Sequence, residues 1–236
     1  GYRVLAVDMR APALTHERLA FISLDLAHEK LPDALDGETS GVIHSAGKNI
    51  FGRWSPSFKQ AVYDSRIVST RNLVNTFAAW KVKPEVYLSA SAFGYYGDKG
   101  EASVDESLPV GEDFGAKVCA DLEREAERAS LVDIRTVHIR TAHVLGRGGL
   151  LAPLFLPFRL GLGATLGRGS GWLPWVHIDD IVSLYIYALE HEAVLGPINS
   201  AAPEAVRQKE FMQHFARAMH RPLLFAIPIF MLSIRY

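Results

Sequence analysis

The sequence has little cysteine, no long apolar run and almost no net charge. Cys119 is the single cysteine among 236 residues, which excludes an internal disulfide framework and fits a reducing compartment such as the cytoplasm. No segment reaches the roughly 18 apolar residues of a membrane-spanning helix, and the most apolar stretch, 148–158, contains two prolines. The 25 basic and 26 acidic side chains leave no excess of positive charge, so no nucleic-acid partner is expected.

The remaining composition is typical of a globular chain. Apolar residues make up 49% and charged residues 22%, which excludes a disordered protein. A chain of this mass buries roughly 70% of its unfolded surface, so it needs no disulfide or structural metal. Gly1-Tyr2-Arg3 does not resemble a signal peptide. The abrupt beginning and the apolar ending at Ile234-Arg235-Tyr236 predict that both ends are cropped.

Short apolar runs predict strands of a parallel sheet. They cover residues 4–7, 21–26, 41–44 and 86–89, and residues 134–139 and 197–200 continue the pattern. The first four are too short for helices, nearly continuous in hydrophobicity and bounded by turn residues. These features are typical of strands that are buried on both faces.

Helical periodicity appears between these runs. Apolar residues recur at helical spacing in 58–80, and 116–129 is rich in alanine, glutamate, leucine and arginine, with Asp113 as its N-cap. Residues 178–189 and 209–219 are amphipathic, the latter with Phe211, Phe215 and Met219 facing inward. Strands that alternate with long helices predict an α/β fold with a doubly wound parallel sheet.

Residues 146–171 differ in composition from the preceding segments, with eight glycines and two prolines among apolar residues. We interpret them as loops and short helices that cover a site, because their apolar side chains need burial. The side chains in question are Leu150, Leu154, Phe155, Phe158 and Leu160.

Acidic residues follow the first two predicted strands. A carboxylate at such a strand end accepts hydrogen bonds from both ribose hydroxyls of a dinucleotide, and Asp8 has this position. Arg10 stands two residues on and suits a 2′-phosphate, so NAD and NADP are both open. The alternative is that Asp8 caps a turn. Asp25 and Leu26, at the end of the next predicted run, are candidates to bracket the adenine ring.

Small and hydroxyl-bearing residues follow the next two strands. Strand 41–44 leads into Ser45-Ala46-Gly47, which allow close backbone approach to a ligand. Strand 86–89 leads into a polar cluster that includes Ser91, Tyr95 and Tyr96. A doubly wound sheet places its chemistry at this edge. In contrast, His177, Asp179 and Asp180 are interpreted as a helix start and no metal site is predicted.

Several segments resemble one family in order and spacing. The chain is similar to atypical extended short-chain dehydrogenases/reductases, and within them to the epimerase family protein 39U type of the nucleoside-diphosphate-sugar epimerase branch. The segments that carry the resemblance are 42–47, 89–98, 140–146, 156–163 and 173–180.

The resemblance implies a Rossmann-type dinucleotide-binding domain over 1–145 and a substrate-side region over 146–236, interleaved with the sheet. It places Asp8, Met9 and Arg10 at the adenosine ribose or its phosphate. The departures from relatives at Asp8 and Met9 favour NAD over NADP. The resemblance also implies that Ser45, Ala46 and Gly47 line the dinucleotide and that Arg66 faces it. Val144 then lies near the nicotinamide end. The substrate pocket is bordered, by the same resemblance, by Arg168, Trp172 and Trp175.

Two departures from the family pattern stand out. The opening strand and the Gly-rich phosphate loop should precede Gly1 and are missing. The tyrosine and lysine that normally handle the proton are replaced by Gly115 and Cys119, when the helix is aligned on Glu123. Ser91 then polarises the substrate oxygen and Tyr95 or Tyr96 donates the proton, while Lys117 is a candidate to reach a ribose or phosphate.

The predicted function is that of an NAD(P)-dependent oxidoreductase or epimerase. Its partner is a small molecule with a hydroxyl or carbonyl group, with a nucleotide sugar as one possibility. The loss of the usual tyrosine and lysine keeps a second hypothesis open, which is a dinucleotide-binding sensor or scaffold with little catalysis.

Overall fold

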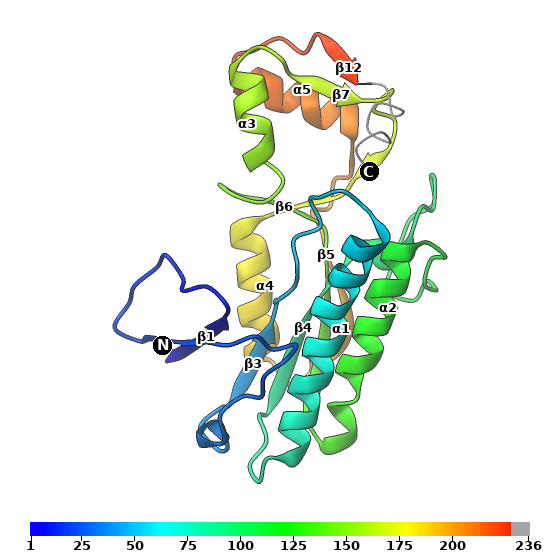
Figure 1. Cartoon of the computed structure of the whole chain (residues 1–236). Coiled ribbons are helices and arrows are strands. Elements are labelled where there is room, and N and C mark those ends of the chain that lie inside the picture. Colours follow the sequence, from blue (N-terminus) through cyan, green and yellow to red (C-terminus); the bar gives the residue numbers. More distant parts are fainter. Residues whose placement is uncertain (228–236) are drawn as a thin grey trace.

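The computed structural model describes residues 1–227, so the apolar ending at 234–236 lies outside the described residues. The centre of the fold is a four-stranded parallel sheet in the order β10-β5-β4-β3 (Figure 1). A separate parallel pair is formed by β1 and β2. The bounds of these strands are β1 Val4–Asp8, β2 Leu19–Ser23, β3 Gly41–His44, β4 Val86–Ala92, β5 Arg135–Thr141 and β10 Gly196–Ser200.

The strands agree with the sequence pattern in place and differ from it in extent. β2 ends at Ser23, so the predicted strand 21–26 is wrong over its second half, where Asp25 begins a turn by accepting a hydrogen bond from the Ala27 amide. β4 runs three residues beyond the predicted Ser89, because β5 pairs with it as far as Ala92.

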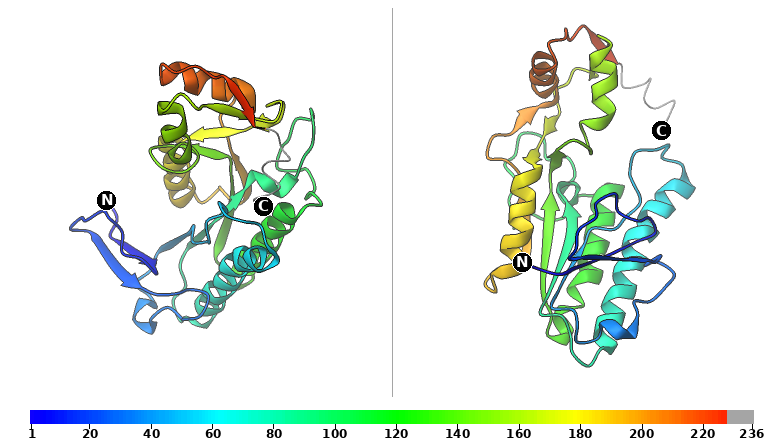
Figure 2. Two further views of the ribbon diagram at one scale, coloured as in Figure 1. Left: turned by 45° about the horizontal axis from the view of Figure 1, so that its top comes forward. Right: turned by 90° about the vertical axis from the view of Figure 1, so that its left-hand side faces the viewer.

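Three helices cover the sheet: α1 (Pro56–Ala79), α2 (Phe114–Glu127) and α4 (Ile178–Glu190). Ser55 caps α1 by accepting from the Phe58 amide, and Asp113 caps α2 by accepting from the Ala116 amide, as predicted for Asp113. α1 and α2 lie on one face of the sheet and α4 on the other (Figure 2). Accordingly, Tyr87 packs with the α1 residues, whereas Leu88 packs with the α4 residues.

A smaller lobe follows β5 and carries α3 and α5 above the sheet (Figure 1). Its core includes the buried side chains of Phe158, Leu173 and Phe211. Two residues predicted to be buried are exposed, Phe155 by 41% and Leu160 by 64%, because α3 presents one side to solvent. The lobe elements are β6 His143–Leu145, α3 Ala152–Arg159, β7 Ala164–Leu166, β8 Trp172–Leu173, β9 Trp175–His177, β11 Val206–Arg207, α5 Gln208–Ala218 and β12 Phe225–Ile227.

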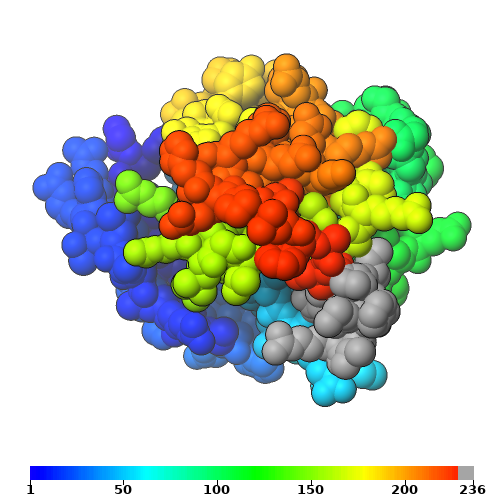
Figure 3. All heavy atoms as spheres, turned by 90° about the horizontal axis from the view of Figure 1, so that it is seen from above, coloured from blue at the N-terminus to red at the C-terminus, as the bar shows by residue number. Residues whose placement is uncertain are grey.

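Within residues 1–227, four short strand pairs accompany the main sheet, three of them in the lobe and one the β1–β2 pair beside β3 (Figure 1). β6 pairs with β9, β7 with β12, and β8 with β11. Seen from above, the lobe covers the middle of the molecule and the N-terminal residues lie at one side (Figure 3). Single-turn 3-10 helices occur at Asp33–Leu35, Phe93–Tyr96 and Ser130–Val132.

The predicted α/β class with a doubly wound parallel sheet is confirmed, with one structural difference. β1 and β2 are not hydrogen-bonded to the main sheet, and β1 is only partly buried rather than buried on both faces. α4 and β10 belong to the sheet although they follow residue 146, so the division at 145 stays a prediction. None of the helices within residues 1–227 has the length and hydrophobicity needed to cross a membrane.

Candidate functional site

The carboxyl ends of the parallel strands define the candidate site. β3 ends at His44, opposite Ser89 of β4, and β4 continues to Ala92 opposite Thr141 of β5. The predicted site residues form two groups at this edge. One group lines a groove between β1 and β3, and the other surrounds a buried arginine of β5.

The groove has a volume of about 1190 Å³ and receives residues from both sheets. Asp8 lies at the end of β1, Leu26 in the turn after β2, and Ser45 and Ala46 directly after β3. Four of the residues predicted from the sequence to contact a dinucleotide therefore share one hollow. Met9, Arg10, Asp25, Gly47, Arg66 and Val144 are not among the described residues that line it.

Asp8 stabilises a turn and still has a carboxylate that is accessible to a ligand. Its Oδ1 atom accepts a hydrogen bond from the Arg10 backbone amide at 2.9 Å, so the cap predicted as the alternative does form. The carboxylate nevertheless remains exposed and keeps acceptor capacity for a further donor. Met9 is 67% exposed and Arg10 is exposed beside it.

Asp25 and Leu26 are held by local contacts. The Asp25 carboxylate lies 2.9 Å from the His28 ring nitrogen and accepts from the Ala27 amide, and these bonds lower its pKa. Leu26 is buried, and its carbonyl oxygen accepts from the Asn72 amide group at 3.0 Å. The pair is therefore fixed in place, with Leu26 facing the groove.

The loop after β3 is tied to α1. The Lys48 amide donates to Ser65 Oγ at 2.9 Å, and Arg66 Nη1 donates to the Lys48 carbonyl oxygen at 2.9 Å. A Cβ atom at Gly47 would come within 2.9 Å of the Arg66 guanidinium carbon. A side chain at position 47 would therefore force the Arg66 side chain to shift from its present contacts, and the pKa of Arg66 is lowered by burial.

The second group surrounds a buried ion pair. Arg140, in β5 opposite Ser91, forms a bidentate pair with Glu123 of α2 at 2.8 and 2.9 Å. Ser91 Oγ donates to Glu123 Oε1 at 2.6 Å. Tyr96 Oη accepts from Arg140 Nη1 at 2.8 Å and donates to Asn199 Oδ1 at 2.7 Å. The hydroxyl protons of Ser91 and Tyr96 are thus both engaged within the protein.

Tyr95 contacts the same arginine in a different way. The guanidinium carbon of Arg140 lies 3.5 Å from the centre of the Tyr95 ring, a close cation–π contact. Tyr95 is half-buried, and within residues 1–227 its hydroxyl has no hydrogen-bond partner. Of the three predicted catalytic side chains, Tyr95 is the one whose hydroxyl stays free for a ligand.

Sequence reasoning did not predict the Glu123–Arg140 pair. The two side chains are 10% and 4% exposed, and each is held by hydrogen bonds that compensate for its burial. Burial opposes the charge of Arg140, but its bonds to Glu123 and Tyr96 outweigh this effect and raise its pKa. The position of Arg140 directly after the predicted strand 134–139 was the signal available in the sequence.

The helix that normally carries a tyrosine and a lysine has neither at the aligned positions. Gly115 lies in the first turn of α2, and Cys119 is buried, which raises the pKa of its thiol to about 11. Lys117 forms an ion pair with Asp121 at 3.1 Å, next to Tyr63 of α1. The ammonium of Lys117 is held by Asp121 of the same helix, and its candidate role at a ribose or phosphate stays a prediction.

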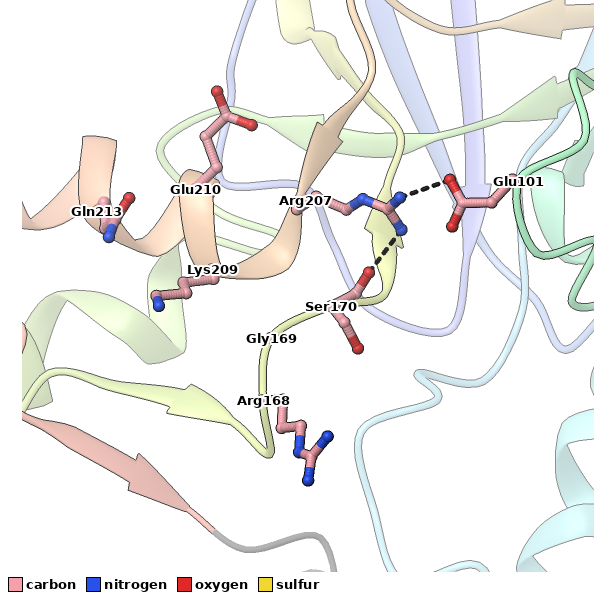
Figure 4. Close-up of a pocket in the computed structure, with 8 residues that line it drawn as sticks. All are labelled: Glu101, Arg168, Gly169, Ser170, Arg207, Lys209, Glu210 and Gln213. Carbon is pink, nitrogen blue, oxygen red and sulfur yellow. Dashed lines mark hydrogen bonds and ion pairs between the residues drawn. The ribbon is translucent and has the colours of Figure 1, made fainter.

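A second hollow, of about 490 Å³, lies in the small lobe (Figure 4). Arg207 donates to the Ser170 carbonyl oxygen and to Glu101, and its guanidinium stacks 3.7 Å from the Trp172 ring centre. Arg168 extends away from Arg207 (Figure 4). Arg168, predicted to border a substrate pocket, lines this hollow, whereas Trp172, predicted for the same role, contacts the lining residue Arg207.

Two other predictions concern β6 and α4. Val144 lies in β6, paired with Val176, and packs against the buried Ala142. The prediction that His177 starts a helix is confirmed, since it caps α4 and its Nδ1 atom accepts from the Asp179 amide at 3.2 Å. Asp179 and Asp180 lie in the first helical turn, where negative charge is favourable.

The sequence matches the profile of the NAD dependent epimerase/dehydratase family over residues 1–200. The chain therefore belongs to this family, in agreement with its doubly wound sheet. It is 38% identical over 192 residues to the epimerase family protein YfhF of Bacillus subtilis, covering 81% of this chain and 63% of that protein. It is also 38% identical over 205 residues to the chloroplastic SDR39U1 homologue of Arabidopsis thaliana, covering 85% of this chain and 58% of the relative.

Solved structures give the same result. The human epimerase family protein SDR39U1, crystallised with NADPH, matches with a TM-score of 0.85 and 28% identity over 100% of this chain and 78% of its own. A nucleoside-diphosphate sugar epimerase from Corynebacterium glutamicum matches with a TM-score of 0.72 and 29% identity, over 92% of this chain and 46% of its own. The resemblance to the 39U type is confirmed. The chain spans about three fifths of the length of the two curated relatives.

Proposed function

We propose that the protein is an NAD(P)-dependent epimerase or oxidoreductase that acts on a hydroxyl or carbonyl group of a nucleotide sugar. The observation that carries this proposal is the groove between β1 and β3, which is lined at the carboxyl ends of the two strands by Asp8, Ser45 and Ala46. Open α/β sheets bind their ligands in this position. Membership of the family and the likeness to the human and Corynebacterium structures support the cofactor and substrate classes.

The residues of this edge fit a dinucleotide. The exposed Asp8 carboxylate accepts hydrogen bonds from ribose hydroxyls, as an acidic residue at this strand end does. Ser45 and Ala46 are small enough for close contact, and the loop that holds them is fixed to α1 through Ser65 and Arg66. When bound, the nicotinamide supplies or accepts the hydride. The protein supplies orientation and proton handling.

Tyr95 handles the proton in this proposal. In the reducing direction, its hydroxyl donates a proton to the substrate oxygen while the carbonyl carbon gains a hydride. Arg140 contacts the face of the Tyr95 ring through its 3.5 Å cation–π interaction. Ser91 and Tyr96 then do not donate a proton to the substrate, because their hydroxyl protons are engaged within the protein. Ser91 offers only lone pairs beyond its bond to Glu123, and Tyr96 positions Arg140 against Asn199.

The second candidate function is a dinucleotide-binding sensor or scaffold. It is favoured by one observation, which is that Gly115 and Cys119 of α2 offer no proton-transfer group where a tyrosine and a lysine are usual. A sensor of this kind binds the dinucleotide through Asp8, Ser45 and Ala46 and leaves Tyr95 without a chemical role.

Two measurements on the purified protein separate these functions. Titration with NADH and NADPH, followed by nucleotide fluorescence, tests binding, and absorbance at the reduced nicotinamide band with a panel of nucleotide sugars and carbonyl compounds tests turnover. An enzyme loses at least about 100-fold in turnover on Tyr95→Phe, in line with removal of a general acid. Tyr187→Phe, at a 51% exposed tyrosine of α4, is the control and keeps full activity. Tight binding without any turnover decides for the sensor.

Asp8 determines the choice of nucleotide. The exposed Asp8 carboxylate would repel the 2′-phosphate of NADPH, and between exposed charges this repulsion amounts to about 1 kcal/mol. We therefore expect NADH to bind more tightly than NADPH and Asp8→Ser to reverse this preference. Equal affinities for both nucleotides, unchanged by the substitution, would contradict the role of Asp8.

A further inference from the structure

Four arginines within residues 1–227 are partly or fully buried, and three of them have a compensated charge. Arg140 and Arg207 form ion pairs with glutamates. Arg135 donates to three backbone carbonyl oxygens at the end of α4, where the helix dipole is negative. The fourth is Arg66 of α1.

Arg66 has no comparable compensation. Within residues 1–227 it donates to backbone carbonyl oxygens and to the Ser65 hydroxyl and forms no ion pair, and residues 228–236 contain no aspartate or glutamate. Charges removed from water are normally paired, because their desolvation is costly. An uncompensated guanidinium beside a candidate site therefore indicates an anionic ligand.

One edge of the Arg66 guanidinium is free. Nη1 donates to the carbonyl oxygens of Lys48 at 2.9 Å and Val62 at 3.3 Å, and these bonds fix the group. Within residues 1–227, Nε and Nη2 make no hydrogen bond, and neither belongs to the polar atoms enclosed in the core. These two nitrogens form an edge with which arginine donates two parallel hydrogen bonds to a carboxylate or a phosphate.

The loop between β3 and α1 places this edge near the candidate site. A Cβ atom at Gly47 would come within 2.9 Å of the Arg66 guanidinium carbon, and the preceding residues Ser45 and Ala46 line the groove. The loop rises from the edge of the sheet toward the small lobe (Figure 1). Arg66 is therefore next to the groove although it does not line it.

The loop and the start of α1 carry positive charge. Residues 39–63 contain no aspartate or glutamate but contain Lys48, Arg53 and Lys59. The ammonium groups of Lys48 and Lys59 lie over aromatic rings, at 5.6 and 5.5 Å from the ring centres. Cation–π contacts leave the positive charge available to an anion.

The cations between α1 and α2 show the opposite arrangement. Asp121 and Glu125 of α2 neutralise four basic side chains there, at distances of 2.6–3.1 Å. The four are Arg71, Lys117, Arg124 and Arg128. Positive charge is thus neutralised between the helices and left unneutralised beside the loop after β3.

We propose that Arg66 binds the diphosphate of a nucleotide through its Nε and Nη2 atoms, with Lys48 as a second cation. A phosphate offers two oxygens to the forked edge and supplies the missing negative charge. The second phosphate then meets the ammonium of Lys48. The anion site is argued from the guanidinium alone, whereas the choice of a nucleotide rests on the proposed function.

Binding titrations with three probes test this proposal. NADH represents the dinucleotide, UDP represents the diphosphate of a nucleotide sugar, and inorganic pyrophosphate represents the bare anion. We expect Arg66→Leu to weaken the binding of at least one nucleotide by about 10- to 100-fold, which corresponds to the loss of a hydrogen bond between charged groups. Lys48→Met removes an exposed cation and weakens the same nucleotide by about fivefold or less.

Arg71→Leu is the matched control on the same helix. Its side chain is 47% exposed and is neutralised by Glu125, so the affinities for all three probes stay those of the wild type. Arg66→Lys keeps the charge but lacks the forked edge, and it must also weaken nucleotide binding. This conservative variant carries the test if Arg66→Leu does not fold.

Thermal unfolding without ligand separates a binding role from a structural one. Replacement of an unpaired, partly buried charge by an apolar side chain removes a desolvation cost, so the Tm of Arg66→Leu does not fall. A lower Tm together with unchanged affinities would show that Arg66 serves the fold, and it would overturn the proposal.

The three probes also separate this proposal from the proposed function. A loss with NADH alone assigns Arg66 to the dinucleotide, and a loss with UDP alone assigns it to the nucleotide sugar. Binding of pyrophosphate that depends on Arg66, without affinity for either nucleotide, supports the anion site and refutes the proposed function. Nucleotide binding that is equal in the wild type and both Arg66 variants refutes the role of Arg66 and leaves the proposed function standing. Absence of binding by all three probes overturns both.

Discussion

Replacement of Glu123 by glutamine removes the charge that compensates Arg140 in the interior. The Arg140 side chain is 4% exposed and keeps its positive charge, because its guanidinium does not deprotonate. Breaking a buried ion pair from one side costs about 3–5 kcal/mol. In a chain of this size each kcal/mol lowers the Tm by about 2–4 °C, so we expect Glu123→Gln to lower it by about 10 °C.

Glu125→Gln provides the matched control on the same helix. Glu125 also pairs with two arginines, Arg71 and Arg128, but their side chains are 47% and 43% exposed. Pairs with exposed partners contribute about 1 kcal/mol or less, so its Tm falls by no more than a few degrees. Urea unfolding followed by tryptophan fluorescence gives both free energies. If the two variants lose equal stability, the Glu123–Arg140 pair is not the buried element described above.

Three further predictions concern His44, Cys119 and the N-cap of α2. Burial lowers the pKa of His44 to about 4, so the unfolded chain binds more protons than the folded chain between about pH 4 and 6.5. The free energy of unfolding of the wild type should therefore fall by about 2 kcal/mol between pH 7 and pH 5 through this group. Urea titrations at the two pH values should show that His44→Gln removes this loss. The buried Cys119 thiol, with its pKa raised to about 11, should resist a thiol reagent at pH 8 until the protein unfolds, and rapid labelling of the native protein would refute its burial. Asp113→Ala removes the cap of α2 and should cost about 1 kcal/mol, whereas an unchanged unfolding midpoint would show that the cap contributes nothing.

The sheet and helices could be predicted because their hydrophobic patterns are local. The extension of β4 to Ala92 could not, since Ser89-Ala90-Ser91 has the composition of a turn. In the fold this segment lies between β3 and β5 at its start and along β5 at its end. Neighbouring strands supply the burial and the hydrogen bonds that the small side chains themselves do not indicate.

β1 shows the opposite case. Its continuous hydrophobicity predicts burial on both faces, yet its residues are only partly buried and its two ends are exposed. The pattern is correct for a strand inside a wider sheet, and the exposure arises from the groove beside it. The difference between the apolar composition of β1 and its partial burial therefore reflects the open groove next to this strand.

The candidate site was predictable only in part. The positions of Asp8, Ser45 and Ser91 follow from the rule that ligands bind at the carboxyl ends of parallel strands. This rule does not predict which residues form hydrogen bonds with Ser91. Glu123 lies in a helix with many charges and has the pattern of a solvated residue, and only the register that places Arg140 opposite Ser91 brings the two charges together.

The stability of the fold alone does not explain why Glu123 and Arg140 form a buried ion pair. Apolar residues of the same volume often serve as well as a buried ion pair or better, because both charges must be removed from water. The pair does what apolar residues cannot do. It holds the Ser91 hydroxyl, the Tyr96 hydroxyl and the Tyr95 ring in one arrangement through hydrogen bonds of 2.6–2.9 Å and a 3.5 Å cation–π contact. A cluster that leaves the Tyr95 hydroxyl free while fixing its ring is better explained by a ligand at this edge than by the needs of folding.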